Sequence, residues 1–144
     1  MQPFEGHGAE NPFGVQHTLQ DLMQDLVGIV RQESEMLQAL DRIRELKTRS
    51  LQVSVDGNRE YNAGWHTALD LRNLLTVSEI VTRAALERRE SRGAHFRDDF
   101  PSKDEQFGRF NIVARKGANG EVQLTREPIA VMREDLRQVI EEMK

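Results

Sequence analysis

The chain contains no cysteine among its 144 residues. This absence excludes disulfide bonds, thiolate zinc sites, iron–sulfur ligation and a cysteine nucleophile within the chain, and it fits a reducing compartment. No apolar run approaches the ~18 residues that a membrane-spanning helix requires. Residues 1–6 also lack the basic and apolar regions of a signal peptide. We therefore expect a cytoplasmic protein with no direct membrane insertion, peripheral to a membrane only through partner subunits.

Neither sign of charge dominates the chain. Its 20 basic and 24 acidic residues give a net charge of −4, and the two signs are interleaved. A nucleic-acid surface would need clustered Lys and Arg without interleaved acids, so we expect no nucleic-acid partner. Hydrophobic residues make up 38% and charged residues 31%. This composition is polar but not that of a disordered chain, and the length allows one domain with a modest core.

Three stretches have the three- and four-residue apolar spacing of amphipathic helices. The first runs from about Pro12 to Val30, with Asn11 as its cap and Pro12 at the first helical position. The second runs from about Glu33 to Thr48, and the short break before it predicts antiparallel packing on the first. The third runs from about Asn62 to Arg89. Its apolar surface is wider than one stripe, so we expect more than one neighbour to cover it.

The pattern changes between and after these helices. Residues 49–62 read as an extended connection that contains one short strand at most. Residues 110–114 and 122–125 flank a glycine-containing segment with Asn119-Gly120, which predicts a β-hairpin, and residues 134–143 predict a short final helix. The fold class is therefore mainly α: a three-helix, spectrin-repeat-like bundle with a trailing β-hairpin or irregular segment and a short C-terminal helix.

The same boundaries divide the chain into parts. Residues 1–11 read as a flexible leader or a linker remnant. Residues 12–144 read as a single helical domain. Within it we expect the bundle over 12–92, the loop and hairpin over 93–128, and the short helix over 133–143.

The usual signatures of catalysis and cofactor binding are missing. No Gly-x-Gly-x-x-Gly follows a predicted strand, and no two of the four histidines have the His-x-x-x-His spacing of a metal site. His66 and Asp70 lie four residues apart on the third helix, which favours a helix-surface or interdomain hydrogen bond, since no third group completes an acid–base set. Trp65 is expected in the core with its indole N–H bonded. We therefore predict no catalytic, cofactor-binding or metal-binding residue.

The segment 88–101 is dense in charge and directly follows the third helix. Gly93 fits a left-handed residue just past the helix end, and Pro101 forbids further helix. Three interpretations stay open: a folded, hydrogen-bonded loop pressed against another domain, a solvated loop, and direct binding of a substrate by an arginine. We favour the first, because Ser, Gly, His and two Phe lie among the ion-pairing residues. Its candidate interdomain or structural residues are Glu90, Ser91, Arg92, Gly93, His95, Arg97 and Asp99.

Four stretches in order carry a resemblance to a known family. They are residues 23–31 (Met-Gln-Asp-Leu-Val-Gly-Ile-Val-Arg), residues 61–71 with Gly-Trp-His-Thr-Ala-Leu-Asp-Leu, residues 84–101 with Arg-Glu-Ser-Arg-Gly-Ala-His, and residues 125–128 (Thr-Arg-Glu-Pro). Together they resemble the C-terminal helical domain of the succinate dehydrogenase/fumarate reductase flavoprotein subunit, in a superfamily that also holds L-aspartate oxidase. The second stretch is more similar to the succinate dehydrogenase branch.

The resemblance implies a part of an enzyme. In the full-length protein it implies exchange of hydride between succinate or fumarate and FAD, with electrons passing to an iron–sulfur subunit. The family's flavin and substrate residues lie in other domains, so we expect no cofactor in this segment and no activity from it alone. The implied partners are the FAD-binding domain of the same subunit, which this segment would buttress, and the iron–sulfur subunit.

Two other interpretations stay open: a free-standing helical adaptor, and the equivalent domain of L-aspartate oxidase. A piece of a larger enzyme exposes apolar area that its neighbouring domain covers. We therefore also expect self-association, or an apolar patch on the third helix or near the 88–101 segment.

Overall fold

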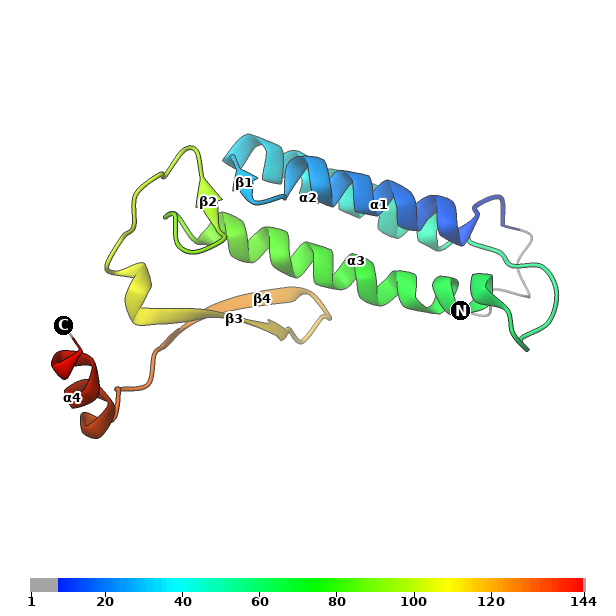
Figure 1. Cartoon of the computed structure of the whole chain (residues 1–144). Helices are drawn as coiled ribbons and strands as arrows, with labels where there is room; N and C mark the ends of the chain where they lie inside the picture. The colour runs from blue at the N-terminus through cyan, green and yellow to red at the C-terminus, as the bar shows by residue number, and fades with distance from the viewer. Residues whose placement is uncertain (1–7, 144) are drawn as a thin grey trace.

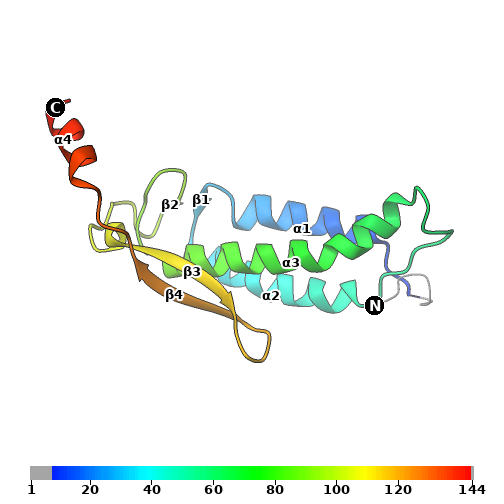
Figure 2. The same cartoon turned by 90° about the horizontal axis from the view of Figure 1, so that it is seen from below.

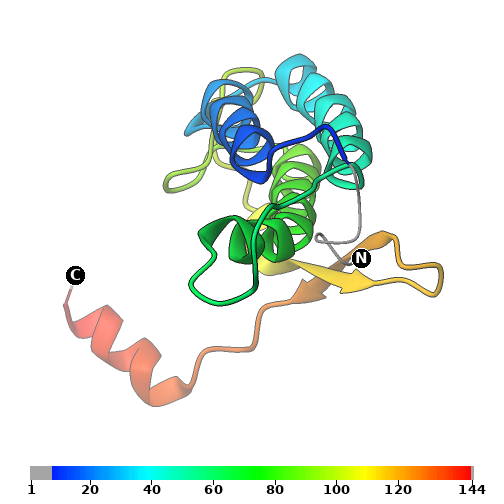
Figure 3. The ribbon, with the colours of Figure 1, turned by 90° about the vertical axis from the view of Figure 1, so that its right-hand side faces the viewer.

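Three helices dominate the computed structural model, which describes residues 8–143. They are α1 (Pro12–Leu26), α2 (Glu33–Ser50) and α3 (Ala63–Glu87). The helices lie side by side, with α2 running antiparallel to both α1 and α3 (Figures 1 and 3). The predicted mainly α fold, with a three-helix bundle, a trailing hairpin and a short final helix, is confirmed. No helix among the described residues combines the length and apolarity needed to cross a bilayer.

The core lies along the bundle axis, where the apolar stripes of the three helices meet. Each helix contributes fully buried aliphatic side chains, because residues three and four apart lie on one face. The connection between α2 and α3 adds one more. The buried core consists of Val15, Leu19, Leu22, Val27, Ala39, Ile43, Leu46, Val53, Leu71 and Leu75.

Helix α1 begins as predicted but ends early. The Asn11 side chain accepts a hydrogen bond from the Phe13 N–H at 2.9 Å, and Pro12 occupies the first turn. The predicted end at Val30 is wrong, because the last helical residue is Leu26. Gly28 is a poor helix former, and two residues beyond it strand β1 (Val30–Arg31) begins, which pairs with a distant loop.

Helix α3 also begins at its predicted cap and ends before its predicted end. The Asn62 side chain accepts from the Trp65 N–H at 3.1 Å, and the helix ends at Glu87 with Arg88 in an extended conformation. Gly93 has a positive φ of 60°, but it lies six residues beyond the last helical residue. It is not the helix terminator; it forms the corner of a separate turn.

Residues at the end of α2 and in the link from α2 to α3 contact Glu10, near the start of the described residues. Glu10 and Val53 form an isolated parallel bridge, and the Arg49 guanidinium contacts the Glu10 carboxylate at 2.7 and 3.0 Å. Of the leader predicted over residues 1–11, residues 1–7 lie outside the described residues. The other four are attached to the bundle through these contacts.

The hairpin consists of strands β3 (Phe110–Lys116) and β4 (Val122–Pro128) in antiparallel register, following the short 3₁₀ helix η1 (Phe107–Arg109). Gly120 has a φ of 83° in its five-residue loop, as the predicted Asn119-Gly120 turn requires. The hairpin lies along α3 (Figures 1 and 2), and Arg126 of β4 forms an ion pair with Glu87 of α3 at 2.6 Å. Helix α3 thus has α1, α2 and the hairpin as neighbours, which confirms that more than one element covers its apolar surface.

The packing of the bundle predicts that substitution by Ala lowers stability much more at one position of α2 than at another. Ile43 is 1% exposed and Leu37 is 50% exposed. Replacing Ile43 by Ala should lower the free energy of unfolding by about 2–5 kcal/mol, since it leaves a cavity in the core. Leu37→Ala should lower it by less than about 1 kcal/mol. Chemical denaturation followed by circular dichroism measures both, and equal effects would contradict this account of the core.

Candidate functional site

The 88–101 loop, meaning residues 88–101, folds over one end of the bundle. Strand β2 (Phe96–Arg97) within it pairs in parallel with β1, in the register Val30–Phe96 and Arg31–Arg97. This pairing places the loop where α1 ends, α2 begins and α3 ends (Figure 1). The loop therefore lies beside two helix C-termini and one helix N-terminus, which carry unpaired backbone groups of opposite polarity.

Arg97 occupies the centre of this end and is 0% exposed. Its Nη1 donates to the carbonyl oxygens of Ala85 at 2.9 Å and Leu86 at 3.2 Å, in the last turn of α3. Its Nε and Nη2 donate to the two carboxylate oxygens of Asp99 at 2.7 and 2.6 Å. The guanidinium also lies over the Phe100 ring, 5.0 Å from its centroid. A positive charge at a helix C-terminus is favourable, and the two-point pair with Asp99 fixes its direction.

Asp99 connects this arginine to the next helix. Its Oδ2 accepts from the backbone N–H of Glu33, the first residue of α2, at 3.2 Å. The preceding residue, Gln32, provides no side-chain cap for α2, so Asp99 supplies the cap from a distant part of the chain. Hydrogen bonds from Arg97 lower the pKa of Asp99. The Asp99 carboxylate therefore stays ionised at neutral pH, and its pair with Arg97 joins the end of α3 to the start of α2.

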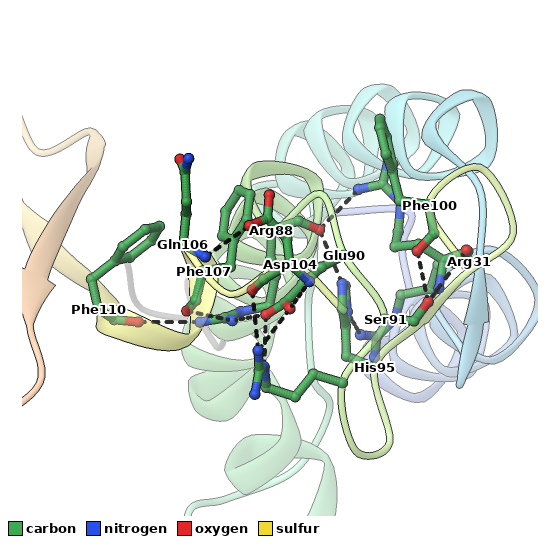
Figure 4. A network of polar contacts seen from close by, with 12 residues as sticks. Arg31, Arg88, Glu90, Ser91, His95, Phe100, Asp104, Gln106, Phe107 and Phe110 are labelled. Carbon is green, nitrogen blue, oxygen red and sulfur yellow. Dashed lines mark hydrogen bonds and ion pairs between the residues drawn. The ribbon is translucent and has the colours of Figure 1, made fainter. Parts of the chain in front are cut away.

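Glu90 forms a second ionic centre and is also 0% exposed. Its carboxylate accepts from Arg88 at 2.5 Å, from Arg92 at 2.9 and 3.0 Å, and from the backbone N–H of Asp104 at 2.9 Å (Figure 4). The Arg92 hydrogen bonds, followed by the Asp104 N–H and Arg88, lower the pKa of Glu90 to about 2. The buried carboxylate thus has partners for both oxygens, as a buried charge requires.

Ser91 and Gly93 shape the loop between these two centres. The Ser91 hydroxyl donates to the Phe100 carbonyl oxygen at 2.9 Å and accepts from the Arg97 N–H at 2.9 Å. Arg92 and His95 exchange two backbone hydrogen bonds of 2.8 and 3.1 Å around Gly93. A positive φ at Gly93 allows this tight reversal. The loop is therefore a fixed structure with its own backbone pairing.

His95 is held as a neutral imidazole. Its Nε2 lies 3.1 Å from the Arg88 carbonyl oxygen and its Nδ1 lies 2.6 Å from Nη1 of Arg31. A carbonyl only accepts and a guanidinium only donates, so Nε2 carries the proton and Nδ1 accepts. Burial, followed by the nearby positive charges of Arg31 and Arg97, lowers the pKa of His95. His95 therefore links the α1 end to the α3 end without a charge of its own.

The geometry of the 88–101 loop favours a folded support over a binding site for a substrate. The side-chain nitrogen and oxygen atoms buried within residues 8–143 all have hydrogen-bond partners, and the buried Arg97 has every guanidinium nitrogen engaged. A dicarboxylate would therefore have to displace Asp99 to reach it. The loop binds the ends of α2 and α3, which agrees with the predicted folded, hydrogen-bonded loop.

Four contributors were absent from the predicted residue set: Arg31, Glu33, Arg88 and Asp104. Arg31 also donates through Nε to the Gly28 carbonyl oxygen at 2.6 Å, beyond the end of α1. The hydrogen bonds that Glu33 and Asp104 donate to Asp99 and Glu90 come from their backbone N–H groups, which any residue type provides, so composition gave no signal for them. The Glu33 carboxylate also lies 3.7 Å from Nη2 of Arg97. The two arginines did carry a signal, since both lie within the four quoted stretches.

The predicted residues Trp65, His66 and Asp70 do not join the loop. They lie in the first turns of α3, at the opposite end of the bundle from the loop. Trp65 is half-buried, not fully in the core, and its ring packs edge-on against His66 with centroids 5.1 Å apart. Among the described residues no hydrogen bond joins His66 to Asp70, and both are exposed.

Residues 8–143 do not fit a flavin dinucleotide. A pyrophosphate is held where a glycine-rich turn leads from a strand to free N–H groups of a helix. Strand β1 does lead to α2, but through Gln32, and the first N–H of α2 is bound by Asp99. Nor do the described residues gather three or more His, Asp or Glu side chains in a position to hold a metal ion.

Apolar side chains nevertheless surround the loop. A groove of about 390 Å³ runs between α3 and β3, lined by Val81, Ala84 and Ile112 together with Arg31, Arg88 and His95. Exposed large hydrophobic residues along α3 are Leu69, Leu74, Val77 and Val81, and Ile29, Val30 and Phe96 are exposed near the loop. Exposed apolar side chains therefore lie on the third helix and near the loop, where a patch was expected.

A family model described as fumarate reductase flavoprotein C-term matches residues 16–140 of this chain. The chain belongs to this family. Among curated relatives, the succinate dehydrogenase flavoprotein subunit of Coxiella burnetii is 34% identical over 100 residues, which is 69% of this chain and 17% of the relative. L-aspartate oxidase of Yersinia pestis is 41% identical over 92 residues, which is 62% of this chain and 16% of the relative.

A solved structure of this family has the same fold. Mycobacterium smegmatis Sdh1 in complex with UQ1 matches with a TM-score of 0.89 and 44% identity, over 98% of this chain and 24% of that chain. The resemblance drawn from the four quoted stretches is thereby confirmed. The chain spans only about a quarter of that chain's length, and 16–17% of the two curated relatives.

The Glu90 centre predicts a loss of stability when its charge is removed. Glu90→Gln keeps the shape but leaves Arg88 and Arg92 without a counter-charge, so the free energy of unfolding should fall by roughly 2–3 kcal/mol. Glu105→Gln, at an exposed position nearby, should change it by less than about 0.5 kcal/mol. Urea denaturation at pH 7 measures both variants, and no difference between them would contradict the role of Glu90.

The low pKa of Glu90 also predicts the pH range of its effect. A carboxyl whose pKa is lower in the folded protein than in the unfolded protein stabilises the fold at pH values above its unfolded pKa. That stabilisation is lost as the pH falls towards its folded pKa. The stability difference between the wild type and Glu90→Gln should therefore be full above pH 4.5 and shrink as the pH falls towards about 2. A difference independent of pH over this range would mean that the Glu90 charge is not involved.

The contacts of Arg97 predict that a positive charge alone at position 97 does not stabilise the fold as well as the guanidinium does. Arg97→Lys keeps the charge but loses the planar fork that reaches both Asp99 oxygens and the α3 carbonyls. We expect a loss of about 2–4 kcal/mol in the free energy of unfolding, against less than about 0.5 kcal/mol for Arg109→Lys at an exposed position. Thermal denaturation checks the pair, and a stable Arg97→Lys protein would refute the capping role.

Proposed function

We propose that this chain is the C-terminal domain of a flavoprotein subunit that interconverts succinate and fumarate with FAD. The observation that supports it most is the match to Sdh1 over 98% of the chain at 44% identity. In this proposal residues 12–144 form one helical domain, residues 1–11 link it to the preceding sequence, and the flavin and substrate chemistry belongs to the rest of the subunit.

The proposed role of the segment is to buttress the FAD-binding domain through the loop end of the bundle. The buried Glu90 carboxylate and the buried Arg97 guanidinium are both held by several hydrogen bonds there, so the end presents one fixed shape. The exposed side chains Val81 and Phe96 flank it and supply apolar area for an interdomain contact. Glu90, Ser91, Arg92, Gly93, His95, Arg97 and Asp99 would then be structural residues of that contact.

The full subunit would work in a complex. An iron–sulfur subunit would take the electrons from FAD, and partner subunits would hold the assembly at the membrane from the cytoplasmic side. The isolated 144-residue chain, with its apolar loop end uncovered, would be inactive and would tend to self-associate.

A second candidate is the equivalent domain of L-aspartate oxidase. The 41% identity to the Yersinia pestis enzyme over 92 residues favours it. Both candidates place FAD in the rest of the subunit and differ in the substrate, which residues outside this segment would select.

One preparation separates these candidates. The full reading frame that contains this segment is expressed and its flavin content is measured. We expect bound FAD, reduction of an artificial dye with succinate, and no hydrogen peroxide from L-aspartate. Peroxide formation with L-aspartate and no reaction with succinate would instead identify an L-aspartate oxidase. A reading frame without flavin-binding sequence, giving a flavin-free protein, would support the free-standing adaptor.

A further inference from the structure

The last helix, α4 (Glu134–Glu142), has one apolar face that its own domain leaves uncovered. Leu136, Val139 and Ile140 lie on that face and are 51%, 51% and 45% exposed, and Met143 follows one turn on at 82%. No residue of α4 is buried. The helix projects away from the bundle beyond the end of the hairpin (Figures 1 and 2), so its position is not set by the bundle core.

A nine-residue helix of this kind needs a partner to be stable. Isolated helices shorter than about 12–15 residues are marginal in water, and α4 has no side-chain cap at its N-terminus. Within the described chain its ion pairs, Arg133–Asp135 and Arg137–Glu134, are local. An apolar face repeating at three and four residues is the pattern of a helix that packs in an apolar groove.

The size of the face favours a partner in the same polypeptide. A stable interface between separate proteins usually needs about 20–30 residues on each side, whereas α4 offers three apolar side chains and Met143 adds a fourth. A covalently tethered surface needs far less, because the tether keeps its effective concentration high. In addition, the match to Sdh1 covers 98% of this chain, so it includes most of α4. The matched part is 24% of that single Sdh1 chain.

We propose that the apolar face of α4 packs on an apolar surface of the same flavoprotein subunit, in the part that lies outside this segment. This contact would act as a second clamp on the subunit, separate from the loop end of the bundle. The inference rests on the proposed function in one respect: the subunit must contain further sequence outside this segment. It does not depend on which substrate the enzyme uses.

Hydrogen exchange of the backbone amides tests the contact directly. The exchange of residues 134–142 is compared between the 144-residue chain and the full-length subunit. We expect it to be at least tenfold slower in the full-length subunit, with no other subunit added and no dependence on protein concentration. Flavin content and succinate activity are measured on the same preparation, so a failed activity assay with a protected α4 would overturn the proposed function alone.

A matched pair of variants assigns the protection to the apolar face. Val139→Asp in the full-length subunit should return the exchange of α4 to the rate of the isolated chain, while Gln138→Asp, on the polar face one residue away, should leave it slow. Equal rates in the wild-type chain and the wild-type full-length subunit would overturn the inference without any variant. Protection that appears only on adding the iron–sulfur subunit, or only at high protein concentration, would overturn it as well and point to another subunit or a second copy.

Discussion

The ion pair between the buried Arg97 and the exposed Asp99 is the interaction on which the order of this domain's loop end depends. One side chain neutralises the carbonyl end of α3 and the other caps the N–H end of α2. The two helix ends carry opposite partial charges, so an ion pair placed between them satisfies both. Because Arg97 is fully buried, removing Asp99 would leave a buried positive charge without its nearest counter-charge. The relative position of α2 and α3 at this end is thus set by charge as well as by packing.

The Glu90 centre extends the same principle to the hairpin. Arg88 and Arg92 hold the carboxylate, and Arg88 also donates to the Phe107 carbonyl oxygen at 3.2 Å, just before β3. The Arg126 guanidinium of β4 lies over the rings of Phe107 and Phe110, at 5.2 and 4.9 Å from their centroids. A two-stranded hairpin is only marginally stable alone. These contacts and its packing on α3 fix it to the bundle and leave the adjoining groove open.

A chain with 31% charged residues and a modest core gains much of its specificity from such buried polar contacts. Their low-dielectric surroundings make each satisfied bond strong and each unsatisfied group costly. The same contacts keep the Glu90 carboxylate ionised and His95 neutral at pH 7, and they engage every guanidinium nitrogen of Arg97. The geometry is that of a fixed loop with exposed apolar side chains beside it.

The spacing of apolar residues, the caps at Asn11 and Asn62, and the Asn119-Gly120 turn were sufficient to predict the three helices and the hairpin, since these signals act over a few neighbouring residues. The mixture of Arg, acid, Ser and Gly after α3 was sufficient to predict a folded loop. The fold was needed to show which acid each arginine binds, that α1 ends at Leu26 and Val30 pairs with Phe96, and that Asp99 caps α2. The last two contacts join residues 66 positions apart. The arginine–acid pairs are close in sequence, but side chains of one charge are interchangeable in a linear pattern until the fold places them at a particular distance.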